Sequence, residues 1–397
     1  MRWLGMMALA TVVAGTGCQK KSEGQAGAPA AQATTPAPQA DASAIVIGHV
    51  TSLTGDTATF GESSNNGVKL AVDEANAAGG VKGHKIALQV YDTAGKPEET
   101  ATAATRAITE AKATLLIGEL GSSRTLALAP IADTNKIPAI TPASTNPKIT
   151  KDGDKTRPYM FRVCFIDPFQ GTVMAKFARQ NLKVGRAAII RDVGNDYSVG
   201  LADYFVKTFK ELGGEIVVDV SYKSGDQDFK AQLTKVKFAK PDFVYIPGYY
   251  TDVALLGRQS RELGLKAQLG GGDGWDSAKL YEIAQGALDG GFFTNHYSAD
   301  NPSPVVQGFA KKYEAAYHTK PDAFAALGYD AARLAVDAMG RAADLSPAAI
   351  RDAIEKTTSL QAVTGTIRLD ADHNPVKSAV IIGIEKNAPK YVTTVEP

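Results

Sequence analysis

Residues 114–125 read TLLIGELGSSRT, an apolar run followed by small and hydroxyl residues that open a helix. The unbroken apolar run from Thr114 to Gly118 is typical of a parallel strand that is covered on both faces. In open α/β sheets, ligands bind outside the carboxyl ends of such strands. This stretch therefore predicts a layered α/β fold, and it directs the search for a binding site to the loop at 119–125.

The same alternation of apolar runs and helical patterns continues along the chain, and regular βαβ alternation predicts doubly wound α/β layers. Strands are expected at Ile45–Val50, Ile86–Tyr91, Thr114–Gly118, Pro138–Thr141, Ala187–Arg191, Ile216–Val220, Phe243–Pro247 and Gly291–Thr294. Helices are expected at Asn65–Ala78, Pro97–Glu110, Ser198–Leu212, Phe229–Phe238, Asp252–Leu263, Val305–Tyr317 and Phe324–Ala343.

The length of 397 residues favours two domains, because single hydrophobic cores stop growing well below that size. The βαβ alternation pauses near Arg157–Asp167 and then starts again, which predicts a crossover between two similar lobes. The final β-rich stretch is expected to complete a lobe. The predicted division is residues 44–165 plus 296–363 for lobe 1 and residues 166–295 plus 364–397 for lobe 2.

The N-terminal region is predicted to lie outside this fold. Residues 1–18 contain a positive start and an uncharged apolar run that is long enough for a signal-peptide core but too short to span a bilayer. The small residues before Cys18 resemble a bacterial lipobox, in which the cysteine is lipidated; an ordinary cleaved signal peptide is the alternative. Residues 19–43 are small, polar and Pro-rich, as expected of a flexible tether. The chain is therefore expected to be extracytoplasmic and anchored to a bacterial membrane through lipid alone.

Composition excludes several classes of function. Lys plus Arg is 43 and Asp plus Glu is 42, so charge favours neither nucleic acid nor an anionic membrane surface. Two cysteines exclude a disulfide framework and a Cys-rich metal site. No Walker, GxGxxG or GxSxG motif occurs, and the five histidines have no metal-ligand spacing, so they are interpreted as surface or loop residues. We expect no enzyme activity, no cofactor and no metal.

Three strand-end loops carry candidate binding residues. Ser122 and Ser123 open a helix, where N–H groups and the helix dipole favour a carboxylate or phosphate, although a plain N-cap serine fits the same pattern. Ser144 and Thr145 follow the next strand in a Pro-containing turn. Asp273 lies in a glycine cluster at another strand end, either as a site carboxylate or as a turn aspartate. Aromatic residues expected in similar loops are Phe60, Tyr197, Tyr249, Tyr250 and Tyr329.

Together these loops resemble the bacterial branched-chain amino acid (Leu/Ile/Val) binding proteins, which are type I periplasmic binding proteins of ABC importers. The likeness runs from about Ile45 to Tyr391. It rests on Thr51-Ser52-Leu53-Thr54-Gly55, Gly79-Gly80-Val81-Lys82-Gly83, Tyr91-Asp92, Ile117-Gly118, Ile140-Thr141-Pro142-Ala143, Tyr197-Ser198-Val199-Gly200 and Asp242-Phe243-Val244-Tyr245. The resemblance implies two lobes joined by a multi-strand hinge, a monomer, and permease and ATPase subunits as partners.

The resemblance also implies a ligand site between the lobes. A ligand carboxylate would meet Ser122 and Thr145, and its ammonium group would meet the Ala143 carbonyl, the Thr145 hydroxyl and Asp273. The residues expected to close or line the pocket are Tyr197, Tyr249, Phe60, Leu120, Gly121, Gly274 and Phe324.

Three features of this chain bear on that site. Asp273 stands where a well-known family member has Glu, and Gly95 and Gly121 stand at the positions of a family disulfide. Gly121 is expected to leave extra space for a ligand side chain. Cys164 lies at the first crossing between lobes and is expected to be a buried free thiol.

The expected function is binding of an α-amino acid, aliphatic or branched-chain, as the substrate-binding component of an ABC importer. A ligand-sensing receptor module of the same fold, or a binder of a small amide or aromatic acid, remain alternatives. A repressor of this fold would need an N-terminal helix-turn-helix, which the signal and tether replace.

Overall fold

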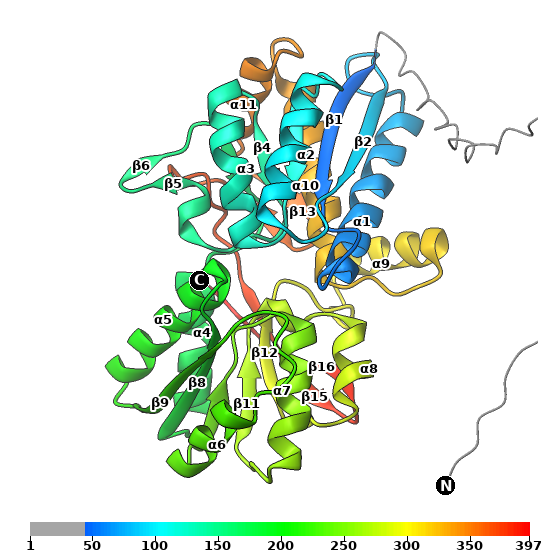
Figure 1. Cartoon of the computed structure of the whole chain (residues 1–397). Helices are drawn as coiled ribbons and strands as arrows, with labels where there is room; N and C mark the ends of the chain where they lie inside the picture. The colour runs from blue at the N-terminus through cyan, green and yellow to red at the C-terminus, as the bar shows by residue number, and fades with distance from the viewer. Residues whose placement is uncertain (1–43) are drawn as a thin grey trace, which may run out of the picture. The chain divides into compact units, whose positions relative to one another are not determined.

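The computed structural model describes residues 44–397, which form two large β-sheets with helices on their faces (Figure 1). The first sheet has five parallel strands in the order β2-β1-β3-β4-β7. Its strands are β1 (Ile45–Thr51), β2 (Ile86–Asp92), β3 (Leu115–Gly118), β4 (Ala139–Thr141) and β7 (Met160–Arg162). Strands β3 and β4 are buried along their whole length, which explains the continuous apolar run that the sequence shows there.

Helices cover this first sheet in packed pairs, α1 with α10 and α2 with α3, while α9 and α11 pack beside α1 and α10. Their bounds are α1 (Ala58–Ala77), α2 (Pro97–Thr109), α3 (Ser122–Asn135), α9 (Pro304–Tyr317), α10 (Ala323–Arg341) and α11 (Pro347–Glu355). Small residues let α1 and α10 approach closely. A Cβ added at Gly67 of α1 would lie 2.0 Å from the carbonyl oxygen of Ala325 in α10.

The second sheet has seven strands in the order β16-β15-β12-β11-β10-β8-β9. Strands β8 to β12 are parallel, and β15 and β16 add an antiparallel hairpin at one edge. The strands are β8 (Arg186–Asp192), β9 (Glu215–Tyr222), β10 (Phe243–Tyr245), β11 (Gln268–Gly271), β12 (Phe292–Asn295), β15 (Ala379–Glu385) and β16 (Ala388–Val395). Its helices are α4 (Asp167–Lys176), α5 (Asp196–Glu211), α6 (Lys230–Ala239), α7 (Tyr250–Glu262) and α8 (Ala278–Ala284).

Short elements complete the described chain. Two small antiparallel pairs join β5 to β6 and β13 to β14. These strands are β5 (Lys151–Asp152), β6 (Lys155–Thr156), β13 (Leu360–Ala362) and β14 (Gly365–Ile367), and the short helical turns are Pro147–Ile149, Phe177–Asn181 and Asp273–Trp275. Within residues 44–397, no helix has both the length and the apolar character required to cross a lipid bilayer.

All eight expected strands are present, and the expected helices are found with shifted ends. Helix α1 begins at Ala58 rather than Asn65, because Phe60, Gly61 and Ser64 are buried there although the local sequence is polar. The elements that were not predicted are helices α4, α8 and α11 and strands β5, β6, β7, β13 and β16. Strand β16 is exposed along most of its length, so it lacks the apolar run that identifies the other strands.

The stretch from Thr364 to Lys377 makes its contacts with elements of the first sheet. Thr364 N donates to the buried carboxylate of Asp330 in α10 (2.9 Å), and Lys377 Nζ donates to the Val163 carbonyl (2.9 Å). His373 stacks on Phe161 of β7, with ring centroids 4.2 Å apart. These contacts go against assigning the stretch to lobe 2. We therefore propose that the last crossing between lobes lies near residue 378 rather than 363.

Candidate ligand-binding site

A small cavity of about 10 Å³ lies where the loops after β3, β4, β10 and β11 meet helices α1, α5 and α10. We call it the inner pocket, and every residue that lines it is among the eleven expected from the sequence. Its lining is Phe60, Leu120, Ser122, Ala143, Tyr197, Tyr249, Asp273, Gly274 and Phe324. The two expected residues that do not line it are Gly121 and Thr145.

One end of the inner pocket is the start of helix α3. Gly121 is the N-cap residue and Ser122 the first helical residue, so the first N–H groups of the helix lie beside the Ser122 hydroxyl. Ser122 Oγ accepts from Asn146 N at 3.4 Å. Because α3 is 14 residues long, its N-terminus carries the partial positive charge that favours an anion.

The other end is the carboxylate of Asp273, which is buried and held by two neutral donors. Tyr197 Oη donates to Oδ1 at 2.9 Å, and His296 Nε2 lies 3.0 Å from Oδ2. Burial lowers the pKa of His296, which outweighs the opposite effect of its hydrogen bond to Asp273, and favours the neutral ring. Among the residues that the structure describes, no lysine or arginine is paired with the Asp273 carboxylate.

A second buried acid, Asp167, lies behind Asp273. Burial raises the pKa of Asp167 to about 8, the neighbouring charge of Asp273 adds to this, and the Thr145 hydroxyl partly offsets it. Asp167 N also donates to the Thr145 carbonyl at 3.0 Å. Thr145 is fully buried beside Asp167 and does not line the inner pocket. Its direct contact with a ligand therefore stays a prediction.

Aromatic rings form the walls between these two polar ends. Phe60 and Phe324 stack with their ring centroids 3.9 Å apart, and Tyr197 and Tyr249 stack at 5.3 Å. Phe60 also meets Tyr249 edge to face at 5.7 Å. These contacts join rings from both sides of the inner pocket and surround its centre with apolar surface.

Other candidate aromatics have different roles. Tyr250 packs edge to face against Phe60, with centroids 4.9 Å apart. Tyr329, expected in a strand-end loop, lies inside α10 and donates to Glu74 Oε2 at 2.7 Å. Trp275, which follows Gly274, is fully buried and does not line the inner pocket; its Nε1 donates to the Ile246 carbonyl at 2.9 Å.

Glu119 and Arg124 form a buried ion pair that the sequence analysis did not single out. Arg124 Nε lies 2.7 Å from Glu119 Oε2, and their side chains are 7% and 0% exposed. Burial by itself would raise the pKa of Glu119, but the charge of Arg124 and hydrogen bonds to the carboxylate outweigh it and lower that pKa. The other donors to Glu119 are the Ser52 and Thr93 hydroxyls and the backbone N–H groups of Leu120 and Gly121.

The expectation that Gly121 leaves free space for a ligand is wrong. A Cβ added at Gly121 would lie 2.5 Å from both Cζ and Nη2 of Arg124, so the guanidinium fills that space. A Cβ added at Gly95 would lie 4.0 Å from Arg124 Nη1. The guanidinium therefore occupies the region between the two positions at which the resembled family carries its disulfide.

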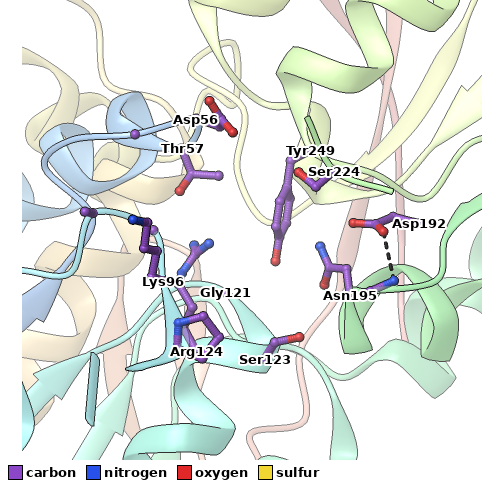
Figure 2. A pocket seen from close by; sticks show the side chains of 15 residues that line it. Asp56, Thr57, Lys96, Gly121, Ser123, Arg124, Asp192, Asn195, Ser224 and Tyr249 are labelled. Carbon is purple, nitrogen blue, oxygen red and sulfur yellow. Dashed lines mark hydrogen bonds between the residues drawn. The ribbon is translucent and has the colours of Figure 1, made fainter. Parts of the chain in front are cut away.

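A larger opening, the outer cleft, lies beyond Tyr249 and measures about 410 Å³. Figure 2 shows the Arg124 guanidinium and the Tyr249 ring facing this cleft, with Lys96 and Thr57 near the first and Asn195 near the second. Its full lining is Gly55, Asp56, Thr57, Ala94, Gly95, Lys96, Pro97, Gly121, Ser123, Arg124, Asp192, Gly194, Asn195, Ser224 and Tyr249. More than half of these lining residues have polar or charged side chains, unlike those of the inner pocket.

Two expectations concern histidine and cysteine. His49, His296 and His373 are buried rather than on the surface, and each is fixed by a hydrogen bond to a carbonyl or carboxylate. Cys164 is a buried free thiol, as predicted, and burial raises its pKa to about 12. The predicted lipidation site, Cys18, lies outside the described residues.

Comparison with known proteins matches residues 44–389 to the periplasmic binding protein family. The Leu/Ile/Val-binding protein BraC3 of Rhizobium johnstonii is 33% identical over 325 residues, covering 81% of this chain and 87% of that protein. The leucine-binding protein LivK of Thermotoga maritima has a TM-score of 0.85 at 39% identity, with 89% of this chain and 99% of that chain covered.

Two further solved structures are bound to different ligands. LivJ, a branched-chain amino acid transporter substrate-binding protein of Streptococcus pneumoniae, was solved with isoleucine (TM-score 0.84, 32% identity, 89% of this chain and 100% of that one). A solute-binding protein of an ABC transporter from R. palustris was solved with benzoate (TM-score 0.80, 26% identity, 89% and 97%). With its two doubly wound α/β sheets and the family match across nearly all described residues, this chain belongs to the periplasmic binding protein family.

Proposed function

We propose that this chain is the extracytoplasmic substrate-binding component of an ABC importer and that it binds an α-amino acid in the inner pocket. One observation carries the proposal: an uncompensated carboxylate, Asp273, shares a small apolar-walled cavity with the N-terminus of helix α3. A buried zwitterion needs an acceptor for its ammonium group and donors for its carboxylate, or its desolvation is not recovered.

The carboxylate of the ligand would bind at Ser122. The Ser122 hydroxyl and the first N–H groups of α3 supply donors, and the helix dipole favours the negative charge. Charge-assisted hydrogen bonds of this kind are worth roughly 1.5–3 kcal/mol each.

The ammonium group would bind at Asp273, with the Ala143 carbonyl as a further acceptor. Tyr197 and His296 orient the Asp273 carboxylate without neutralising it. Asp167 is predominantly protonated near neutral pH because burial raises its pKa to about 8. Asp273 is therefore the carboxyl group that we assign to the ammonium group of the ligand.

The side chain of the ligand would lie among the Phe60, Phe324 and Tyr249 rings. The apolar character of these rings supports an aliphatic or branched-chain amino acid. The relatives named for leucine, isoleucine and valine agree with this substrate class.

The second candidate is an aromatic acid or small amide, whether for import or for sensing by a receptor of the same fold. Two observations support an aromatic acid: one relative was solved with benzoate, and the stacked Tyr197 and Tyr249 rings offer an aromatic surface in the pocket. An aromatic acid carries no ammonium group, however, and would leave the Asp273 charge buried without a partner. For this reason we favour the amino acid.

Calorimetry on the purified chain from residue 44 onward distinguishes these ligands. The panel comprises leucine, isoleucine, valine, glutamine, benzoate and acetamide at one pH and salt concentration. We expect at least one α-amino acid to bind with a Kd of about 10 µM or lower and benzoate and acetamide to bind at least tenfold more weakly. Tight binding of benzoate or acetamide with no binding of any amino acid would exclude the proposal.

We further propose that Cys18 is lipidated and holds the protein at the outside of a bacterial membrane. The apolar run before Cys18 and the polar residues after it support an exported, tethered domain. Labelled palmitate should be incorporated in wild type and in Cys164→Ser but not in Cys18→Ser. Equal labelling of the Cys18→Ser protein would reject the anchor.

A further inference from the structure

Arg124 has more hydrogen-bonding capacity than the protein uses. Its Nε is paired with Glu119, but Nη2 is buried and has no hydrogen-bond partner among the described residues. A buried guanidinium nitrogen without a partner loses hydration and gains nothing in return. The arginine, whose side chain is 7% exposed, therefore has a donor available for an acceptor from outside the described residues.

Glu119 does not require these spare donors. Its carboxylate accepts two hydroxyl groups on Oε1 (2.5 and 2.9 Å) and two backbone N–H groups on Oε2 (2.6 and 2.9 Å), in addition to Arg124 Nε. A carboxylate offers about four lone-pair sites, so this one is saturated. Glu119 holds the arginine in place and leaves the far edge of its guanidinium for another partner.

The free edge of the guanidinium lies at the border between the two cavities. Arg124 lines the outer cleft, and its Cζ lies 5.7 Å from the centroid of Tyr249, the ring that lines both cavities (Figure 2). Gly121, which has no side chain, separates the guanidinium from Ser122 of the inner pocket. A group that extends from the inner pocket past Gly121 therefore meets Arg124 first.

We propose that the ligand carries an oxygen acceptor, a carboxylate or an amide carbonyl, at the end of its side chain, and that Arg124 binds it. This inference rests on the proposed function, because it assumes that the α-amino and α-carboxylate groups lie in the inner pocket. It makes Arg124 a specificity-determining residue and shifts the substrate class from purely aliphatic amino acids to amino acids with a polar tip.

The distances suit a short side chain. Neighbouring Cα atoms are about 3.8 Å apart. The guanidinium lies 2.5 Å from the Cβ position of Gly121, the residue beside Ser122. Ser122 and the free guanidinium nitrogen are thus separated by roughly 8 Å or less. A side chain of three or four bonds, as in glutamine or glutamate, spans the gap between an α-carbon near Ser122 and Arg124.

Calorimetry with three amino acids of similar length tests the proposal. Norleucine has no acceptor, glutamine has an amide carbonyl and glutamate has a carboxylate, so the last two identify which acceptor is preferred. The proteins are wild type, Arg124→Met, and the double variant Glu119→Gln/Arg124→Met, which keeps both side chains close to their original size and removes both charges. Thermal melts confirm that each variant is folded at the assay temperature.

We expect glutamine or glutamate to bind wild type at least tenfold more tightly than norleucine. This ratio should fall below about threefold in both variants, while norleucine affinity changes little. Equal or tighter binding of norleucine by wild type would overturn the inference and leave the proposed function standing. A uniform loss for all three ligands in both variants would also overturn it, because Arg124 would then bind the α-carboxylate. Failure of every amino acid to bind wild type would reject the proposed function itself.

Discussion

Replacing Arg124 by Met should destabilise the fold, because it removes the cationic partner of the buried Glu119 carboxylate. The Glu119 side chain is 0% exposed, and the Met side chain fills much of the space of the arginine stem. Removing one partner of a buried ion pair costs about 3–5 kcal/mol. Glu119 keeps four neutral donors, so we expect the lower end of that range, about 3 kcal/mol of unfolding free energy.

The loss of stability in Arg124→Met should depend on pH. In wild type, burial opposes ionisation of Glu119, yet the charge of Arg124 and the hydrogen bonds lower its pKa below the ordinary value. A carboxyl whose folded-state pKa is lowered stabilises the fold above its unfolded-state pKa, and this stability is lost as pH falls through the folded-state pKa. Without Arg124, burial raises the pKa of Glu119, so the gap between variant and wild type should narrow as pH falls from neutral through the ordinary glutamate range towards the lowered wild-type pKa.

Urea unfolding followed by circular dichroism at pH 7 and pH 4 measures this effect. Glu119→Gln/Arg124→Met should recover at least half of the loss at pH 7, because it removes the unpaired charge. Arg106→Met, which breaks an exposed pair with Glu110 (56% and 62% exposed), is the control and should cost under about 1 kcal/mol. A loss below 1 kcal/mol for Arg124→Met, or an equal loss at both pH values, would refute the reasoning.

Two further predictions concern other buried groups. Burial raises the pKa of Asp167 to about 8, so the folded state holds this proton more tightly than the unfolded state, and the free energy of unfolding falls as pH rises from about 4 to 8. In urea unfolding, Asp167→Asn should therefore stabilise the protein by at least about 1 kcal/mol at pH 8 and by little at pH 4. A stabilisation that does not grow with pH would contradict this prediction. The Cys164 thiol is buried, and burial raises its pKa to about 12. It should therefore not react with a thiol reagent such as DTNB within an hour at pH 8 in native buffer, but it should react fully in denaturant. Rapid labelling in native buffer would contradict this prediction and would show that the chain around Cys164 opens to solvent.

Much of the fold was predictable because the burial of a strand determines the residues of the strand itself. Strands buried on both faces, such as β3 and β10, appear as unbroken apolar runs. Strand β16 is exposed along most of its length and was missed for the same reason. Helix α8, only seven residues long, offers too few turns for a periodic pattern to be recognised.

The residues of the candidate site were predictable only when the strand-end loops were considered together. Each loop by itself fitted a cap or a turn, and the ordered resemblance joined Ser122, Ala143 and Asp273, which the structure brings to one cavity. Arg124 stood in the opening stretch but was passed over, because its role depends on Glu119 and on the space beside Gly95 and Gly121. The burial of His296 was likewise invisible, since Phe165 covers its ring from a distant part of the chain (centroids 3.6 Å apart).

If Asp273 binds the ammonium group of an α-amino acid, removing its charge should weaken binding of that ligand. Calorimetry compares Asp273→Asn with wild type for the amino acid that wild type binds most tightly, with Asp300→Asn, at an exposed position, as the matched control. Asparagine keeps the shape of the side chain and removes the charge. We predict a loss of at least tenfold, about 1.4 kcal/mol, for Asp273→Asn and no change for the control. An unchanged affinity in Asp273→Asn would contradict the account.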